Sequence, residues 1–250
     1  MTVAQKIIPI QTIKSWSHSR AVDFEKCAFS AKLKYINKIP EPERPLPPGK
    51  LEHANDRGTR VHEAIEAYTR GLTDAVPREA WSFRVEIEAL RKLFKAGQAG
   101  FEGNWGYDRA WDVAAWETAW LRMKLDAIVF LSPQEAVVID YKTGKIFGNE
   151  VKHGEQTMLY QLASFLRYPE LEVVHTELWY LDHDQLNGKT FTRNQGLRFK
   201  KAWDMRGTAI TSAIAFPPNP NHWSCRYCPY GKPENGFATG TGHCPVGRKS

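Results

Sequence analysis

The sequence of 250 residues predicts an α/β or α+β fold with a central β-sheet flanked by helices. Segments with apolar residues at helical spacing are mixed with short apolar runs rich in β-branched residues, which is typical of a sheet covered by helices. Hydrophobic residues make up 42% of the chain and aromatic residues 12%, as in ordered globular proteins. The length suits one large domain or one domain with a small appendage.

The N-terminal part is predicted to be helical. Residues 15–39 form a helix-rich segment, because Phe24, Cys27, Ala31 and Tyr35 follow near-helical spacing behind several serines that can cap a helix. The segments that follow are a proline-rich loop and two helices, over residues 40–48, 57–70 and 77–99.

The central part is predicted to supply the strands. Its segments are a strand-like region, a β run, a helix, a strand and a short edge strand, at 111–131, 136–141, 154–166, 173–181 and 190–192. A last helix over 195–214 precedes a proline-rich stretch and a tail with three cysteines. We expect a single domain made of an N-terminal helical segment with its linker, a core, and a cysteine-rich tail closing on Cys27, over residues 15–50, 51–215 and 216–250.

Two apolar runs each carry a carboxylate. Asp126 lies in the run 125–129, and Asp140 lies in the run 138–141 with Lys142 two positions later. Because side chains alternate along a strand, Asp140 and Lys142 point the same way, and pairing of the two runs would bring Asp126 to them. Two carboxylates bind a hard divalent cation, and an ammonium holds an anionic nucleophile or phosphate, which is the chemistry of metal-dependent phosphodiester cleavage. The alternative is a chance Asp–Lys pair on a solvated strand face.

The four cysteines are divided between the two ends of the chain. Cys27 stands near the N-terminus, whereas Cys225, Cys228 and Cys244 lie in a tail rich in proline and glycine. Disulfides are disfavoured in a cytosolic protein, so four thiolates predict tetrahedral Zn²⁺ or a [4Fe–4S] cluster. Two alternatives stay open: a C-x-x-C redox pair with two unrelated thiols, or a local zinc site in the tail completed by a histidine, with Cys27 merely buried.

Charge and hydropathy bound the partners and the compartment. The formal net charge of +6 suits a polyanionic partner. Of nine tryptophans, some are able to stack on bases, but most are expected in the core. The sequence contains no run of 18 apolar residues, so no membrane span is expected. The first ten residues lack the features of a secretory signal. We therefore expect a cytoplasmic protein without a membrane partner.

Six short motifs follow one another along the chain. They are a serine-led helix ending in a cysteine and aromatics (15–35), a Gly-x-x-x-His helix start (58–63), Asp126, the Asp140-Tyr141-Lys142 core, a Gln-x-x-x-Tyr helix (156–160), and a C-x-x-C-P-Y tail with its last cysteine (225–244). In this order they resemble the RecB-type nucleases of the PD-(D/E)XK superfamily, most closely the CRISPR-associated and phage-type exonucleases with four cysteines. The resemblance spans nearly the whole chain and implies a restriction-endonuclease-like core.

The resemblance implies a Mg²⁺ or Mn²⁺ site. Asp126 and Asp140 would hold the ion, and the backbone carbonyl of Tyr141 would add an oxygen ligand. His62 would supply an imidazole nitrogen, which favours Mn²⁺ over Mg²⁺. Without the resemblance, His62 on an apolar helix face is better interpreted as a core histidine.

The resemblance also implies catalytic roles beside the metal. Lys142 would position the attacking water or stabilise charge growing on the phosphate. Gln156 and Tyr160 lie on one helix face and would orient Lys142 or the DNA backbone, although an ordinary solvated helix face would show the same spacing.

For the cysteines, the resemblance implies a [4Fe–4S] cluster held by all four, with Zn²⁺ as the alternative. Fifteen residues separate Cys228 from Cys244, which is longer than the gap usual in the family. The activity implied is a DNA exonuclease that acts on single strands or duplex ends. The alternative is a non-catalytic or partner-dependent DNA-binding subunit of a recombination or DNA-capture complex, and a helicase or recombination protein is a possible partner.

Overall fold

The computed structural model describes residues 11–232 and 240–246, and the chain divides into two compact units. The larger unit is Leu46–Trp203, and the smaller unit combines the residues up to Pro45 with those from Asp204 onward. The single-domain organisation expected from the sequence stays a prediction. None of the helices in the described ranges combines the length and apolar character that a bilayer crossing requires.

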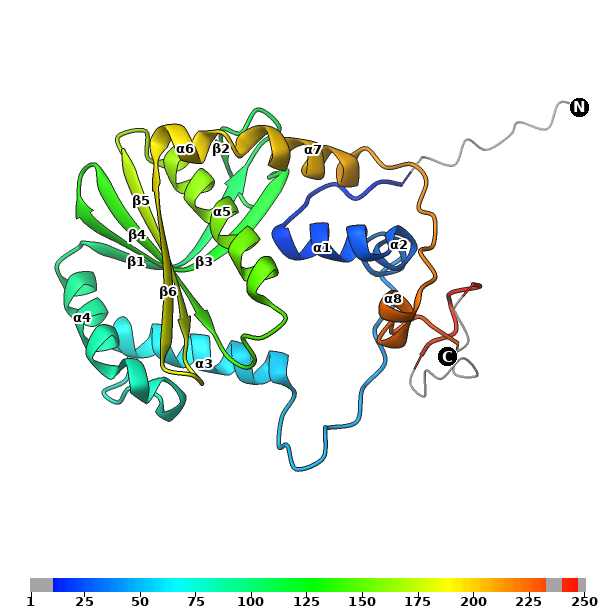
Figure 1. The fold of residues 1–250 in the computed structure, drawn as a ribbon, viewed down its shortest axis with the longest axis horizontal. Coiled ribbons are helices and arrows are strands. Elements are labelled where there is room, and N and C mark those ends of the chain that lie inside the picture. The colour runs from blue at the N-terminus through cyan, green and yellow to red at the C-terminus, as the bar shows by residue number, and fades with distance from the viewer. Residues whose placement is uncertain (1–10, 233–239, 247–250) are drawn as a thin grey trace, which may run out of the picture. The chain divides into compact units, whose positions relative to one another are not determined.

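The larger unit is built on a mixed β-sheet, whose six described strands are ordered β2-β1-β3-β4-β5-β6 (Figure 1). Only β4 and β5 run parallel among these neighbours. A helix, α5, makes the crossover that a parallel pair requires. The strands are β1 (Ala99–Tyr107), β2 (Val113–Ala114), β3 (Leu121–Ser132), β4 (Glu135–Lys142), β5 (Val173–Tyr180) and β6 (Gln185–Thr192).

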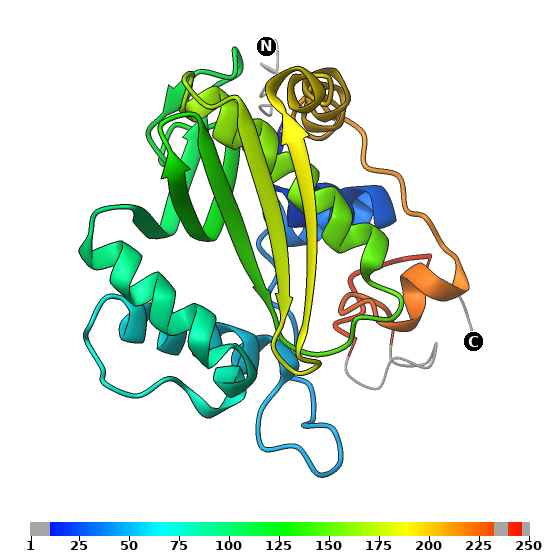
Figure 2. The same cartoon turned by 60° about the vertical axis from the view of Figure 1, so that its left-hand side comes forward.

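Helices cover both faces of this sheet, as Figure 2 shows. On one face lie α3 (Ala54–Thr69), the 3₁₀ helix η1 (Arg78–Phe83) and α4 (Arg84–Lys95), and their apolar side chains form one buried cluster with strand residues such as Ile139 and Tyr141. On the other face lie α5 (Glu150–Arg167) and α6 (Arg193–Leu197). Tyr107 of β1 fixes α5 there, because its buried hydroxyl donates to the Ala163 carbonyl at 2.7 Å. The predicted class, a central sheet flanked by helices, is confirmed.

The strand β1 was not predicted. Its sequence contains three glycines, which lower the strand propensity, and it shows no clear apolar alternation. Packing explains Gly106: a Cβ there would lie 2.6 Å from the Ala114 carbonyl oxygen of β2. The strand-like region 111–131 was too long, because a turn and the short β2 precede β3.

Several other element boundaries differ from the predictions. The helix expected over 77–99 is two helices, η1 and α4, because the backbone of Phe83 between them is non-helical, with φ −101° and ψ 22°. The last helix expected over 195–214 is likewise two, α6 and α7 (Lys200–Thr211). The edge strand β6 is eight residues long rather than three, with mostly exposed side chains that carry no apolar alternation.

The smaller unit contains α1 (His18–Lys26), α2 (Ala28–Tyr35) and α8 (His222–Arg226). The segment predicted as helix-rich is broken at Cys27, whose backbone is extended with φ −163°. Asn219 and Ser224 of the tail both donate side-chain hydrogen bonds to the Lys26 carbonyl, at 3.1 Å each. The N-terminal helices and the segment 219–224 are therefore held together beside Cys27.

Candidate active site

The two predicted runs form neighbouring antiparallel strands. Ala127 of β3 pairs with Ile139 of β4, which puts Asp126 beside Asp140. Beyond that pair, the Asp126 carboxylate accepts a hydrogen bond from the Tyr141 backbone N–H at 2.7 Å. The Asp126 side chain, instead of a backbone carbonyl of β3, thus accepts the hydrogen bond of the Tyr141 N–H. This bond fixes the carboxylate at the end of the β3–β4 ladder.

Asp140 and Lys142 share the face of β4 that α5 covers. Their charged groups form a direct ion pair, and Asp140 is only 4% exposed. Gln156 of α5 joins both: its amide oxygen accepts from Lys142 Nζ at 2.9 Å, and its amide nitrogen lies 3.3 Å from Asp140 Oδ1. Gln156 also contacts the hydroxyl of Tyr160, which donates to the Lys124 carbonyl of β3 at 2.9 Å. This chain of bonds fixes the Lys142 ammonium in one orientation.

His62 belongs to α3, which lies on the face of the sheet opposite to α5. Its Nδ1 lies 3.1 Å from Asp126 Oδ1, and its ring packs edge-on against Tyr141 with centroids 5.6 Å apart. The structure therefore brings together the side chains predicted from the sequence for this site, namely His62, Asp126, Asp140, Lys142, Gln156 and Tyr160.

Burial and charge shift the protonation equilibria of the site. Burial raises the pKa of Asp140; the Lys142 ammonium opposes this shift, and the Asp126 charge adds to it. Burial alone would lower the pKa of His62, but its hydrogen bond to Asp126 and the nearby negative charges outweigh burial and raise it. Burial and the same two carboxylates raise the pKa of Tyr160, so its phenol stays protonated at neutral pH.

The donor set fits a divalent cation. Two carboxylates lie close enough for the charge of one to raise the pKa of the other, and a dication would relieve that repulsion. Among the described residues, no group of three or more His, Cys, Asp or Glu side chains is arranged as a ready metal site. In this site Asp140 is paired with Lys142 and Asp126 with His62, so these pairings would have to loosen for an ion to enter.

A comparison with family models matches residues 15–232 to the PD-(D/E)XK nuclease superfamily. The chain belongs to that superfamily. A solved structure entitled "Crystal structure of SSO0001" is similar at 13% identity with a TM-score of 0.37, covering 90% of this chain and 87% of the other. No curated protein matches the chain. Members of the superfamily are in general nucleases, and the mixed sheet flanked by helices is consistent with the restriction-endonuclease-like core predicted from the sequence.

In this PD-(D/E)XK chain, sequence reasoning missed one residue that holds the site together. Asp182, just after β5, forms a bidentate ion pair with Arg57 of α3, with N···O distances of 2.7 and 2.9 Å. Its carboxylate also accepts a hydrogen bond from the Gly144 N–H at 2.7 Å. It therefore ties the helix of His62 to the loop that follows Lys142. The hydrogen bond to Arg57 lowers the pKa of Asp182, so the pair is ionised at neutral pH. Nearby, Gly58 allows close approach, because a Cβ there would lie 3.3 Å from Thr143 Oγ1.

Asp182→Asn is expected to lower the rate of catalysis about tenfold, because a small misplacement of reacting groups is costly. The amide can still accept from Gly144, so the fold should survive with a loss of about 1 kcal/mol in the free energy of unfolding. Arg57→Gln should have the same effect, and the double variant should be no worse than either single one. Arg60→Gln is the matched control on the same helix, because Arg60 pairs with Glu52 and Glu79 instead. Additive losses in the double variant would contradict a shared positioning role.

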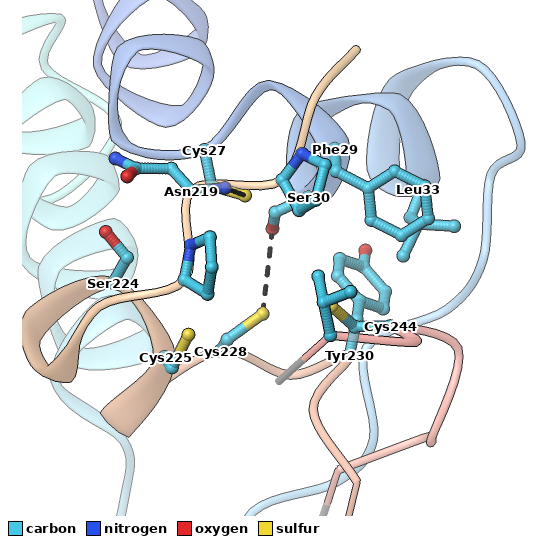
Figure 3. A pocket seen from close by; sticks show the side chains of 13 residues that line it. Cys27, Phe29, Ser30, Leu33, Asn219, Ser224, Cys225, Cys228, Tyr230 and Cys244 are labelled. Carbon is cyan, nitrogen blue, oxygen red and sulfur yellow. Dashed lines mark hydrogen bonds between the residues drawn. The ribbon is translucent and has the colours of Figure 1, made fainter. Parts of the chain in front are cut away.

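The predicted cysteines also come together, within the smaller unit. All four line one pocket with Asn219, Ser224 and Tyr230, as Figure 3 shows. The Asn219 N–H lies 3.5 Å from Cys27 Sγ, and Cys228 Sγ points toward the Ser30 hydroxyl at 3.9 Å. Burial raises the pKa of Cys244, and the neighbouring cysteines add to the shift.

The long gap before Cys244 is closed by backbone hydrogen bonds. After residues 233–239, which lie outside the described ranges, Thr241 and Gly242 donate to Pro229 and Gly231 at 2.9 Å each. Cys244 then donates to the Tyr230 carbonyl at 2.8 Å. The departure from the family's spacing therefore leaves Cys244 at the same pocket as Cys225 and Cys228.

Proposed function

We propose that this chain is a metal-dependent deoxyribonuclease that degrades DNA as an exonuclease, from single strands or duplex ends. The observation that carries the hydrolytic part is the convergence of Asp126, Asp140 and Lys142 at the end of two paired strands, with Lys142 oriented by Gln156. The exonuclease mode and the preference for free ends come from the family resemblance. A cytoplasmic location and a helicase or recombination partner belong to the same proposal.

The residues of the chain have separable roles in this reaction. Asp126 and Asp140 would hold Mg²⁺ or Mn²⁺, with His62 and the Tyr141 carbonyl as further ligands. When bound, the ion supplies Lewis acidity and lowers the pKa of a coordinated water. Lys142 would offer its positive charge to a phosphate or hydroxide. Gln156 keeps that ammonium in place through its 2.9 Å hydrogen bond. Tyr160 in turn anchors Gln156 to the β3 backbone.

The cysteine pocket supports a structural [4Fe–4S] cluster, with Zn²⁺ as the alternative. Four thiols line one pocket and a backbone N–H is directed at Cys27 Sγ, as thiolate sulfur favours. Like the other donors among the described residues, these thiols are not arranged as a ready metal site, so they would have to move together to bind the group. Binding there would join the N-terminal segment to the tail. The chain purified without oxygen should carry iron and sulfide with a broad visible absorbance, whereas a colourless protein with one zinc would select the alternative.

The experiment that tests the nuclease is a time course on linear DNA labelled at the 5′ or the 3′ end, single- or double-stranded. We expect stepwise shortening with Mn²⁺ or Mg²⁺ and none with EDTA, and the label released first gives the polarity. Products of internal cutting would overturn the exonuclease mode. A folded protein that binds DNA but leaves it intact with either metal would overturn the proposal in favour of the non-catalytic or partner-dependent subunit.

A further inference from the structure

Phe147 is 91% exposed, although it lies in a short loop next to the active site. The loop begins directly after Lys142 and leads into α5, which starts at Glu150. The same helix carries Gln156, whose amide oxygen accepts from Lys142 Nζ at 2.9 Å, so the loop connects two elements that both contribute to the site. A ligand that covered this side chain would gain the hydrophobic free energy of burying it.

The loop over residues 143–149 contains a hydrogen-bonded turn that includes Phe147. Asn149 bridges across it, with its backbone N–H donating to the Ile146 carbonyl at 2.9 Å and its side chain donating to the Lys145 carbonyl at 3.0 Å. Gly144 and Gly148 have φ of +96° and +84°, a region that suits glycine. The bond between Gly144 N–H and Asp182 fixes the start of the loop. The backbone on both sides of Phe147 is therefore fixed, while its side chain is exposed.

The surroundings of Phe147 suit a nucleic acid. Val151, the second residue of α5 and four positions after Phe147, is a further apolar side chain that is 77% exposed. Lys145 and Lys152 are both exposed and flank Phe147 along the chain. Apolar rings between lysines are typical of single-strand binding sites, where bases stack on aromatic faces and phosphates contact ammonium groups.

We propose that Phe147 is a stacking platform for a nucleobase of the single-stranded DNA that enters the active site, with Lys145 and Lys152 contacting the adjacent phosphates. This inference deepens the proposed function and rests on it for the identity of the ligand. Stacking needs no particular base, because every base has a π-face, so the platform binds DNA without reading its sequence. It would also determine the distance between a bound base and the phosphate held near Lys142.

The test compares Phe147→Ala, Phe147→Leu and Phe147→Tyr with the parent chain in binding to a fluorescent single-stranded oligonucleotide in EDTA, which prevents cleavage. We expect Phe147→Ala to raise Kd about five- to a hundredfold, as the loss of one base stack does elsewhere. Phe147→Tyr should bind like the parent, and Phe147→Leu should resemble the alanine variant. Leu72→Ala is the matched control, since Leu72 is 75% exposed in the same unit.

A series of oligonucleotides with one abasic position each locates the stacked base. The parent should lose affinity at one position in particular, and Phe147→Ala should lose nothing more at that position. Unchanged Kd in Phe147→Ala, or a change in oligomeric state without a change in DNA binding, would overturn the inference. If the parent binds DNA through Phe147 but never cleaves it, the stacking platform stands and the nuclease proposal fails. If the parent cleaves DNA normally but Phe147→Ala binds DNA as well as the parent does, the nuclease proposal stands and the stacking platform fails.

Discussion

Asp140→Asn is expected to abolish metal-dependent DNA cleavage, with kcat lower by about a thousandfold or more, while the chain stays folded. The substitution removes one negative charge from the pair of carboxylates but keeps an oxygen able to accept from Gln156. The neutral amide removes the cost of burying a carboxylate, which offsets part of the loss that Lys142 suffers when its ionic partner is removed. We expect the melting temperature to change by no more than about 5 °C.

Glu135→Gln is the matched control, because Glu135 lies at the opposite end of the same strand and contacts His175 at 2.8 Å. Its cleavage rate should equal that of the parent chain. Single-turnover rates on end-labelled DNA, measured with saturating Mn²⁺ beside the melting curves, separate loss of chemistry from loss of fold. An Asp140→Asn protein that cleaves within about tenfold of the parent would contradict the assignment of Asp140 to the catalytic centre, since losing a group that acts in the transition state costs more.

The core of the site was predictable because two short-range rules decide it. Alternation along a strand puts Asp140 and Lys142 on one face, and antiparallel pairing of two adjacent apolar runs brings in Asp126. The i, i+4 spacing of Gln156 and Tyr160 likewise gave a shared helix face, and both contact the site. Their catalytic roles stay predictions.

Other parts of the site depend on long-range contacts that no local pattern encodes. Asp182 is a surface-type residue after a strand, and its partner Arg57 is 125 positions away in the sequence. The glycine-rich β1 has no clear apolar alternation, so its place in the sheet follows from packing against β3. The burial of Trp105, Trp120 and Trp179 agrees with the expectation that most tryptophans lie in the core. The exposure of Phe147 was not predicted from the sequence.

Cys27→Ser is expected to remove the visible absorbance of the purified chain and to lower its melting temperature by about 10 °C or more, because binding energy of the cluster becomes folding energy. The local structure indicates that serine at this position does not by itself destabilise the fold. Cys27 occupies the N-cap position of α2 with extended backbone and makes no side-chain capping bond. Serine is among the best N-cap residues and would stabilise α2 by about 1 kcal/mol.

The two effects therefore have opposite signs, which makes the measurement decisive. In protein that carries its iron or zinc, Cys27→Ser should melt well below the parent chain. After the metal is removed from both proteins with a chelator, the variant should melt at the same temperature as the parent or slightly above it. A deficit that persists without metal would mean that the thiol acts through packing against Asn219 instead of as a ligand. Equal melting temperatures in the loaded proteins would remove Cys27 from the ligand set and leave a site within the tail, formed by Cys225, Cys228 and Cys244.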